Sequence, residues 1–225
     1  MAATMHDVAR RAQVSVKTVS NVLNGYRYIR PETRERVEEA ISALEYRVNS
    51  AARSLRSGRS RTVVLAIPEL SQPYFAELAQ ALIDEAAAIG LTVFVQTTGG
   101  QLQREQEVLS GDWPVTADAL IFSPSVTSAV DAAATSPPVP MVLLGERIFR
   151  SRFDHVTMAN AAAAEAATGH LLGSGRRRVL VVGASLDDTT TWTGSLRLQG
   201  ALDAHRARGV DVAPELVVAP HEWSR

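Results

Sequence analysis

Residues 5–25, MHDVARRAQVSVKTVSNVLNG, predict two short helices joined by a tight turn. Apolar residues recur at helical spacing in both halves and give each helix an inward face: Val8, Ala9 and Ala12, then Val19, Val22 and Leu23. The outward face of the second helix carries small or hydrogen-bonding side chains, namely Val16, Lys17, Ser20 and Asn21. Side chains of this kind on an exposed helix suit the major groove of DNA.

The helix ends in this region carry their own signals. Thr4 can cap the first helix, and Asp7 lies near the positive end of that helix. Ser15 is placed to cap the second helix. A third helix is predicted to start at Pro31, and its apolar residues would close a core over the first two: Val37, Ala40, Ile41 and Leu44. Residues 1–46 are therefore expected to form an all-α domain.

Residues 47–61, RVNSAARSLRSGRSR, contain five Arg and no acidic residue. Asn49 or Ser50 can cap a short helix that reaches Leu55, although a segment this short is not stably helical alone in water. Because phosphate groups would neutralise its charges, we expect the segment to fold when it binds DNA.

The charge of the chain is divided unequally. Residues 1–61 hold 12 Lys and Arg against 6 Asp and Glu, whereas the remainder holds 11 against 18. A basic amino-terminal region followed by an acidic region is typical of a nucleic-acid-binding module joined to a domain that does not bind nucleic acid.

Residues 62–160 change to alternating strands and helices. The run TVVLAIPEL predicts a buried strand, and residues 73–89 predict an amphipathic helix. Three further strands are predicted at LTVFVQTT, ADALIFSP and PMVLLGE, with short helices over 103–109 and 128–135. Strands and helices that alternate at this spacing form a parallel sheet with crossover helices.

Residues 161–225 repeat this alternation with fewer elements. The sequence predicts an Ala-rich helix over NAAAAEAATGHLLGSG, a buried strand at VLVVGAS, a helix over 195–208 and a strand at ELVVAP. These elements would begin a second α/β lobe. A complete α/β lobe needs on the order of 100 residues, so we expect the second lobe to be incomplete and the chain to be truncated at its carboxyl end.

DVARRAQVSVKTVSNVLNG resembles the helix-turn-helix of the lactose-repressor (LacI/GalR) family of bacterial transcription regulators. RPETRERVEEAISALEYRVNSAARSLRSGRS resembles the third helix and hinge of that family. The chain departs from the family at Gln13, where Gly is usual, so we expect a non-Gly residue at positive φ in the turn.

The resemblance implies an amino-terminal helix-turn-helix domain followed by an α/β effector-binding domain that is similar to periplasmic binding proteins, with parallel sheets. It also implies a homodimer on a palindromic operator, with residues 73–89 as a candidate dimer surface. The implied division of the chain is a DNA-binding domain over 1–46, a hinge helix or linker over 47–61, a first lobe over 62–160 and an incomplete second lobe over 161–225.

Candidate DNA contacts follow from position in the resembled motif. Base contacts fall on Val16, Lys17 and Asn21. Candidates for phosphate contact are Thr4, Ser15, Thr18, Ser20 and Asn24, and for Ser15 and Thr18 a capping role competes or coexists with that contact. At the hinge, the minor-groove candidates are Asn49, Ala52, Arg53 and Leu55. Leu55 matches the leucine that wedges between base pairs, and the alternative is an apolar anchor against the body of the protein.

An effector is expected in the cleft between the lobes, where parallel strands end. SQPYF after the first strand resembles a family segment, and Arg197 in SLRLQGAL matches a family arginine that holds ligand hydroxyls. The implied effector-binding residues are Ser71, Tyr74, Phe75, Arg147, Asn160 and Arg197. Tyr74 and Phe75 are equally interpretable as core residues, and Arg147 as a surface residue.

Enzyme classes find little support. The sequence has no GxSxG, P-loop, GxGxxG or HExxH motif, no Cys and no His pair at metal-ligand spacing, so we expect no catalysis, no cofactor and no metal. No signal peptide or membrane-length apolar run is present, which favours a cytoplasmic protein. Two hypotheses remain. One is a DNA-binding regulator, a repressor, modulated by a sugar or related metabolite. The other is a small-molecule-binding α/β protein without a DNA role, or a nonfunctional truncated regulator.

Overall fold

The structure is a computed structural model that describes residues 3–46, 58–149, 151–186 and 192–219. It separates into two compact units, Met1–Ser60 and Arg61–Arg225. The predicted minor-groove residues Asn49, Ala52, Arg53 and Leu55 lie outside the described residues.

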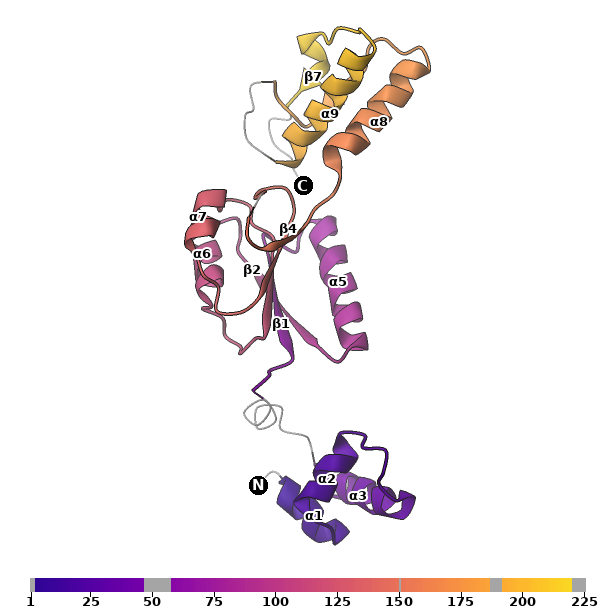
Figure 1. Cartoon of the computed structure of the whole chain (residues 1–225), viewed down its shortest axis with the longest axis vertical. Helices are drawn as coiled ribbons and strands as arrows, with labels where there is room; N and C mark the ends of the chain where they lie inside the picture. The colour runs from indigo at the N-terminus through magenta and orange to yellow at the C-terminus, as the bar shows by residue number, and fades with distance from the viewer. Residues whose placement is uncertain (1–2, 47–57, 150, 187–191, 220–225) are drawn as a thin grey trace. The chain divides into compact units, whose positions relative to one another are not determined.

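The first unit is helical and contains α1 (Met5–Ala12), α2 (Val16–Leu23) and α3 (Pro31–Ala43) (Figure 1). The α1–α2 pair has the two short helices that the sequence predicts. Their inward residues form one core with α3: Val8, Ala9, Ala12, Val19, Val22, Val37 and Ala40. Tyr46, which follows α3 closely in sequence, also packs against this core.

The turn between α1 and α2 has the backbone conformation that the sequence predicts. Gln13 takes φ 53° and ψ 46°, which is the left-handed region, at the carboxyl end of α1. Because a side chain at positive φ costs more than Gly does there, Gln13 introduces modest strain into the turn. The helices on both sides hold it in place through their shared core.

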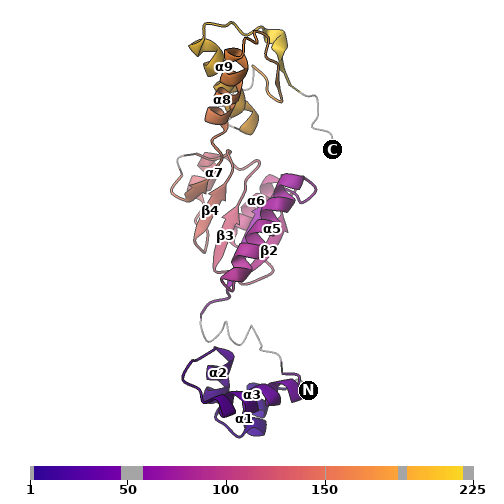
Figure 2. The same ribbon diagram turned by 90° about the vertical axis from the view of Figure 1, so that its right-hand side faces the viewer.

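The second unit begins with a parallel sheet of strand order β2-β1-β3-β4-β5. Figure 2 labels β2, β3 and β4 of this sheet. The order along the chain is β1 (Thr62–Ile67), α5 (Pro73–Ala88), β2 (Thr92–Thr97), α6 (Leu102–Ser110), β3 (Ala119–Phe122), α7 (Ala129–Ala134), β4 (Met141–Leu144) and β5 (Asp154–Val156). The sequence prediction of alternating strands and helices is confirmed, and β5 is an additional short edge strand.

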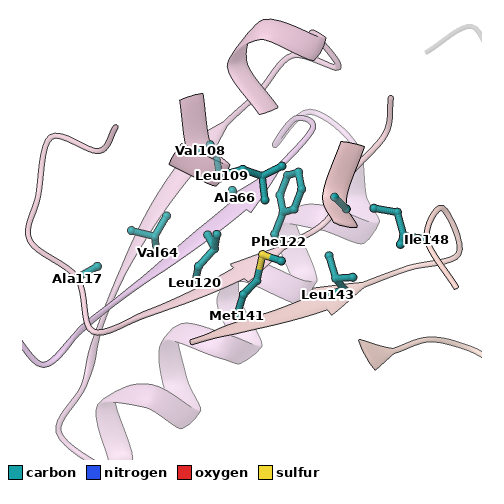
Figure 3. Close-up of a cluster of buried hydrophobic side chains, with 11 residues drawn as sticks. Val64, Ala66, Val108, Leu109, Ala117, Leu120, Phe122, Met141, Leu143 and Ile148 are labelled. Atoms are coloured by element: carbon teal, nitrogen blue, oxygen red, sulfur yellow. The ribbon is translucent and has the colours of Figure 1, made fainter. Parts of the chain in front are cut away.

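Helices cover both faces of this sheet (Figure 1). On the α6 and α7 face, Leu120, Phe122 and Leu143 pack with Val108 and Leu109 of α6 in a continuous buried cluster (Figure 3). On the other face, α5 places Ala79, Phe75 and Leu82 against the sheet residues Leu65, Ile67, Val93, Val95, Ile121 and Leu144. Burial of strand residues on both faces explains why the strand sequences are continuous apolar runs.

The remaining part contains α8 (Asn160–Gly173), β6 (Val181–Val182), α9 (Thr193–Ala207), the short 3-10 helix η1 (Pro214–Leu216) and β7 (Val217–Val218). The prediction of a buried strand at VLVVGAS is confirmed only in part, because the run contains the short strand β6 but is not buried throughout. Only Val181 and Val182 are extended, Val182 is 60% exposed, and β6 pairs with β7 alone among the described strands. One two-residue partner cannot bury an apolar run on both faces, which requires neighbouring strands and helix layers.

Candidate nucleic-acid interface and ligand cleft

The side chains on the outward face of α2 differ in how exposed they are. Lys17 is exposed, whereas Val16, Ser20 and Asn21 are half-buried. Val16 also packs against the core of the first unit. Lys17 is the only lysine in the chain, and its ammonium can donate to guanine O6 or N7 or to a phosphate. Of the predicted base-contact residues, Lys17 therefore has the freest side chain.

The predicted phosphate-contact residues lie at helix ends. Thr4 Oγ1 accepts from the Asp7 backbone N at 3.3 Å, and Asp7 Oδ2 accepts from the Thr4 backbone N at 3.0 Å. Ser15 Oγ accepts from the Thr18 backbone N at 3.1 Å and lies 2.9 Å from Thr18 Oγ1. These contacts order the two helix amino termini. The hydrogen bonds from the Thr4 side chain and backbone, with the charge of Arg10, lower the pKa of Asp7.

The remaining two phosphate candidates sit at the other end of α2. Asn24 Nδ2 donates to Ser20 Oγ at 3.4 Å. Beyond them, the loop before α3 carries Tyr26 and Tyr28, which are 51% and 77% exposed and meet edge to face with ring centroids 5.6 Å apart. Sequence analysis did not single out these tyrosines, although exposed aromatics within a basic segment were a visible signal.

The second unit has a cleft of about 710 Å³ where the strands of the sheet end. Its walls include the segments after β1, β2, β3 and β4, together with the start of α9. Of the predicted effector-binding residues, four line the cleft: Tyr74, Phe75, Arg147 and Arg197. Trp192 adds a third aromatic side chain to the wall.

The other two predicted residues take different places. Ser71 is exposed, and its hydroxyl donates to the Glu69 carboxylate. Asn160 is 5% exposed and lies behind the wall, where it contacts both Glu146 and Arg197. The structure therefore brings Asn160 to the site as a neighbour of lining residues.

Glu146 is the cleft residue that sequence analysis missed. It is 9% exposed and follows β4 directly after Gly145. Its carboxylate accepts hydrogen bonds from Asn160 Nδ2 at 2.8 Å, Thr193 Oγ1 at 2.8 Å and Thr157 Oγ1 at 3.2 Å. Burial and the negative charge of Glu146 raise the pKa of Tyr74, so the field of this carboxylate reaches the tyrosine on the same wall.

A second buried carboxylate supports the cleft from behind. Glu105 on α6 is fully buried and accepts bonds from the backbone N of Ser125 at 2.8 Å and of Thr127 at 2.7 Å. Ser125 Oγ also donates to it at 2.9 Å. Because Ser125 lines the cleft, Glu105 fixes one wall without reaching the cleft itself. No group of three or more His, Asp or Glu side chains able to hold a metal occurs among the described residues.

Comparison with known proteins agrees with this arrangement. Residues 4–49 match the family model "Bacterial regulatory proteins, lacI family", and residues 60–219 match "Periplasmic binding proteins and sugar binding domain of LacI family". Catabolite control protein A of Staphylococcus epidermidis is 33% identical over 187 residues, which cover 81% of this chain and 56% of that protein. The transcriptional regulator pepR1 of Lactobacillus delbrueckii is 35% identical over 80% of this chain and 55% of its own length. The chain thus spans just over half the length of these relatives.

Solved structures show the same fold. A LacI-family regulator from Sanguibacter keddieii is 42% identical, with a TM-score of 0.64 over 74% of this chain and 58% of its own. The lac repressor dimer bound to operator is 21% identical and superposes with a TM-score of 0.78 over the whole of this chain and 67% of its own.

The helical unit and the cleft-bearing parallel α/β unit together define a helix-turn-helix protein with a body like that of periplasmic binding proteins. The chain belongs to the LacI family of bacterial regulatory proteins. No helix among the described residues is both long and apolar enough to cross a membrane.

Proposed function

We propose that this chain acts as a sequence-specific DNA-binding transcription regulator, a repressor, in the cytoplasm. The observation that carries the proposal is the exposed α2 face on a helix-turn-helix unit of net positive charge. A helix presented in this way can enter the major groove, while surrounding cations contact phosphates. Lys17 and Asn21 are the residues that we assign to base edges, with Val16 against a thymine methyl group.

Two copies are required for selective binding. One helix-turn-helix reads only a few base pairs, whereas a two-fold dimer reads a palindrome with half-sites about one helical turn apart. We assign five residues of the helix-turn-helix to phosphate positioning: Thr4, Ser15, Thr18, Ser20 and Asn24. The segment with Asn49, Ala52, Arg53 and Leu55 is assigned to the minor groove.

The cleft is assigned to a small neutral metabolite of the sugar class. Three aromatic side chains, Tyr74, Phe75 and Trp192, can pack on a sugar ring, and Arg197 can donate to its hydroxyls. The match of residues 60–219 to a sugar-binding domain model supports this class. A ligand that prefers one arrangement of the dimer would shift DNA affinity by linkage.

Gel retardation at two salt concentrations with a pool of palindromic duplexes tests the proposal. The regulator predicts retained, enrichable duplexes and an affinity that falls steeply with salt, because phosphate contacts release counterions. Binding of a metabolite without any salt-dependent retention of DNA would favour the other hypothesis, a small-molecule-binding protein with no DNA role.

A further inference from the structure

Asn160, the first residue of α8, lies between an acidic and a basic side chain of the cleft. Its Nδ2 donates to Glu146 Oε1 at 2.8 Å, and its Oδ1 accepts from Arg197 Nε at 2.8 Å. Asn160 is 5% exposed and Glu146 is 9% exposed, so water has little access to the Glu146 bond. A buried amide thus connects a carboxylate to a guanidinium.

The direction of this amide is fixed by the chemistry of its neighbours. A carboxylate only accepts hydrogen bonds and a guanidinium only donates them. The flipped amide would place its oxygen against the Glu146 carboxylate and its NH₂ group against Arg197, which loses both bonds and creates two repulsive contacts. The Glu146 carboxylate also accepts hydrogen bonds from the hydroxyls of Thr157 and Thr193, and these bonds fix its orientation.

Most N–H donors of the Arg197 guanidinium remain available to a ligand in the cleft. Arg197 lines the cleft, and within residues 58–149, 151–186 and 192–219 its side chain makes one hydrogen bond, from Nε to Asn160. Four N–H groups remain on Nη1 and Nη2 in a planar fork that fits two adjacent acceptor oxygens. A fork held at Nε has fewer rotamers to lose when it binds a ligand.

We propose that Glu146 orients Arg197 through Asn160, and that the oriented fork holds a neutral vicinal diol. The diol part rests on the proposed effector role of the cleft. Glu146 lines the cleft and is linked to Arg197 through Asn160, so an anionic ligand on the fork would lie near this carboxylate. Together with burial, which is the larger cause, this negative charge raises the pKa of Tyr74 on the same wall. Asn160 and Glu146 are positioning residues in this scheme.

This relay, from Glu146 through Asn160 to Arg197, is tested by NMR on the full ¹⁵N-labelled chain without ligand. The measurement follows the Arg197 Nε–H signal and the exchange of its proton with water. Asn160→Leu removes the acceptor, and we expect exchange to accelerate roughly tenfold or more, because a charge-assisted bond is lost. Glu146→Gln should accelerate exchange and shift the signal. A Gln side chain has both a donor and an acceptor, so it can pair with either end of the Asn160 amide and no longer fixes which end faces Arg197.

Glu69→Gln is the matched control, since it makes the same change in the same cleft away from Asn160, where Glu69 accepts from Gln72 Nε2 at 2.7 Å. It should leave the Arg197 signal as in the wild type. The relay is overturned if Glu146→Gln behaves as Glu69→Gln does, or if Asn160→Leu, folded by circular dichroism, exchanges at the wild-type rate. Should Asn160→Leu not fold, Glu146→Gln against Glu69→Gln still decides the matter.

The ligand class is tested by calorimetry with matched pairs: D-glucose with D-glucuronate, and D-galactose with D-galacturonate. We expect the neutral member of a binding pair to bind roughly tenfold tighter, because the acid meets like charges. An acid that binds as tightly as its neutral partner overturns the diol assignment. If no sugar in a wider neutral panel binds, the diol assignment and the effector role fail together, while the Arg197 signal still decides the relay by itself.

Discussion

Gly200 of α9 lies so close to Ala161 of α8 that a Cβ atom on Gly200 would stand 2.0 Å from the Ala161 carbonyl oxygen. Backbone cannot yield as a flexible side chain can, so the two helices must separate to admit even one methyl group. This contact packs α9 against α8 and so holds Arg197 and Thr193, both on α9, beside the cleft.

Gly200→Ala is therefore expected to destabilise the second unit by about 3 kcal/mol, at the upper end for overpacking. Urea unfolding followed by circular dichroism measures the change. Gly173→Ala on α8 is the matched control, because a Cβ there meets nothing within 4 Å. That control should change stability by no more than about 1 kcal/mol, in the stabilising direction. Equal stability of the two variants would contradict the close helix contact.

Glu105→Gln should loosen the wall formed by residues 125–127. The Gln amide would place an NH₂ group against backbone N–H donors that the carboxylate now satisfies. We expect a loss of about 3 kcal/mol in unfolding free energy and faster hydrogen exchange at the Ser125 and Thr127 amides. Glu107→Gln on the same helix removes a charge whose carboxylate, among the described residues, accepts a hydrogen bond from Gln103 Nε2 at 3.1 Å, and it should have a small effect. Wild-type exchange at these amides in Glu105→Gln would refute the anchoring role.

Thr4→Val tests the cap at the start of α1. The bonds from Thr4 lower the pKa of Asp7, so removal of the hydroxyl should raise that pKa toward its usual value. A carboxyl with a lowered folded pKa stabilises the unit above its unfolded pKa, and this contribution is lost as the pH falls through the folded pKa. Carboxyl titration by NMR measures the shift. Asp131, whose pKa is lowered by Ser128 in the same kind of capping box, should titrate unchanged and serves as the internal control.

Much of the fold could be predicted from the spacing of apolar residues. The helices of the first unit and the parallel strands of the first lobe follow from local patterns, whereas the positive φ of Gln13 was expected from the resemblance to the LacI family, in which Gly is usual at that position. The run VLVVGAS forms only the short and partly exposed strand β6, because burial depends on neighbouring layers, which a local apolar run does not reveal. A similar apolar run gives a buried strand at β1, where such layers exist.

The cleft was harder to predict than the fold. No sequence pattern distinguishes Glu146 and Glu105 from other charged residues, and charged residues are usually exposed. Their burial arises only when partners from other segments meet them, as Thr193 meets Glu146 across 47 positions of sequence. Arg197 could be named from its motif, whereas its link to Glu146 through Asn160 required the three-dimensional arrangement.

Recognition of DNA by α2 is tested most directly by fluorescence anisotropy with one enriched palindrome and a scrambled duplex of equal length and composition. We expect the wild-type chain to prefer the palindrome by on the order of 10³-fold or more at physiological salt. Lys17→Ala should reduce that ratio and change which base pairs are tolerated, because we assign Lys17 to a base edge. Equal affinity of the wild-type chain for both duplexes would contradict sequence-specific recognition by this helix.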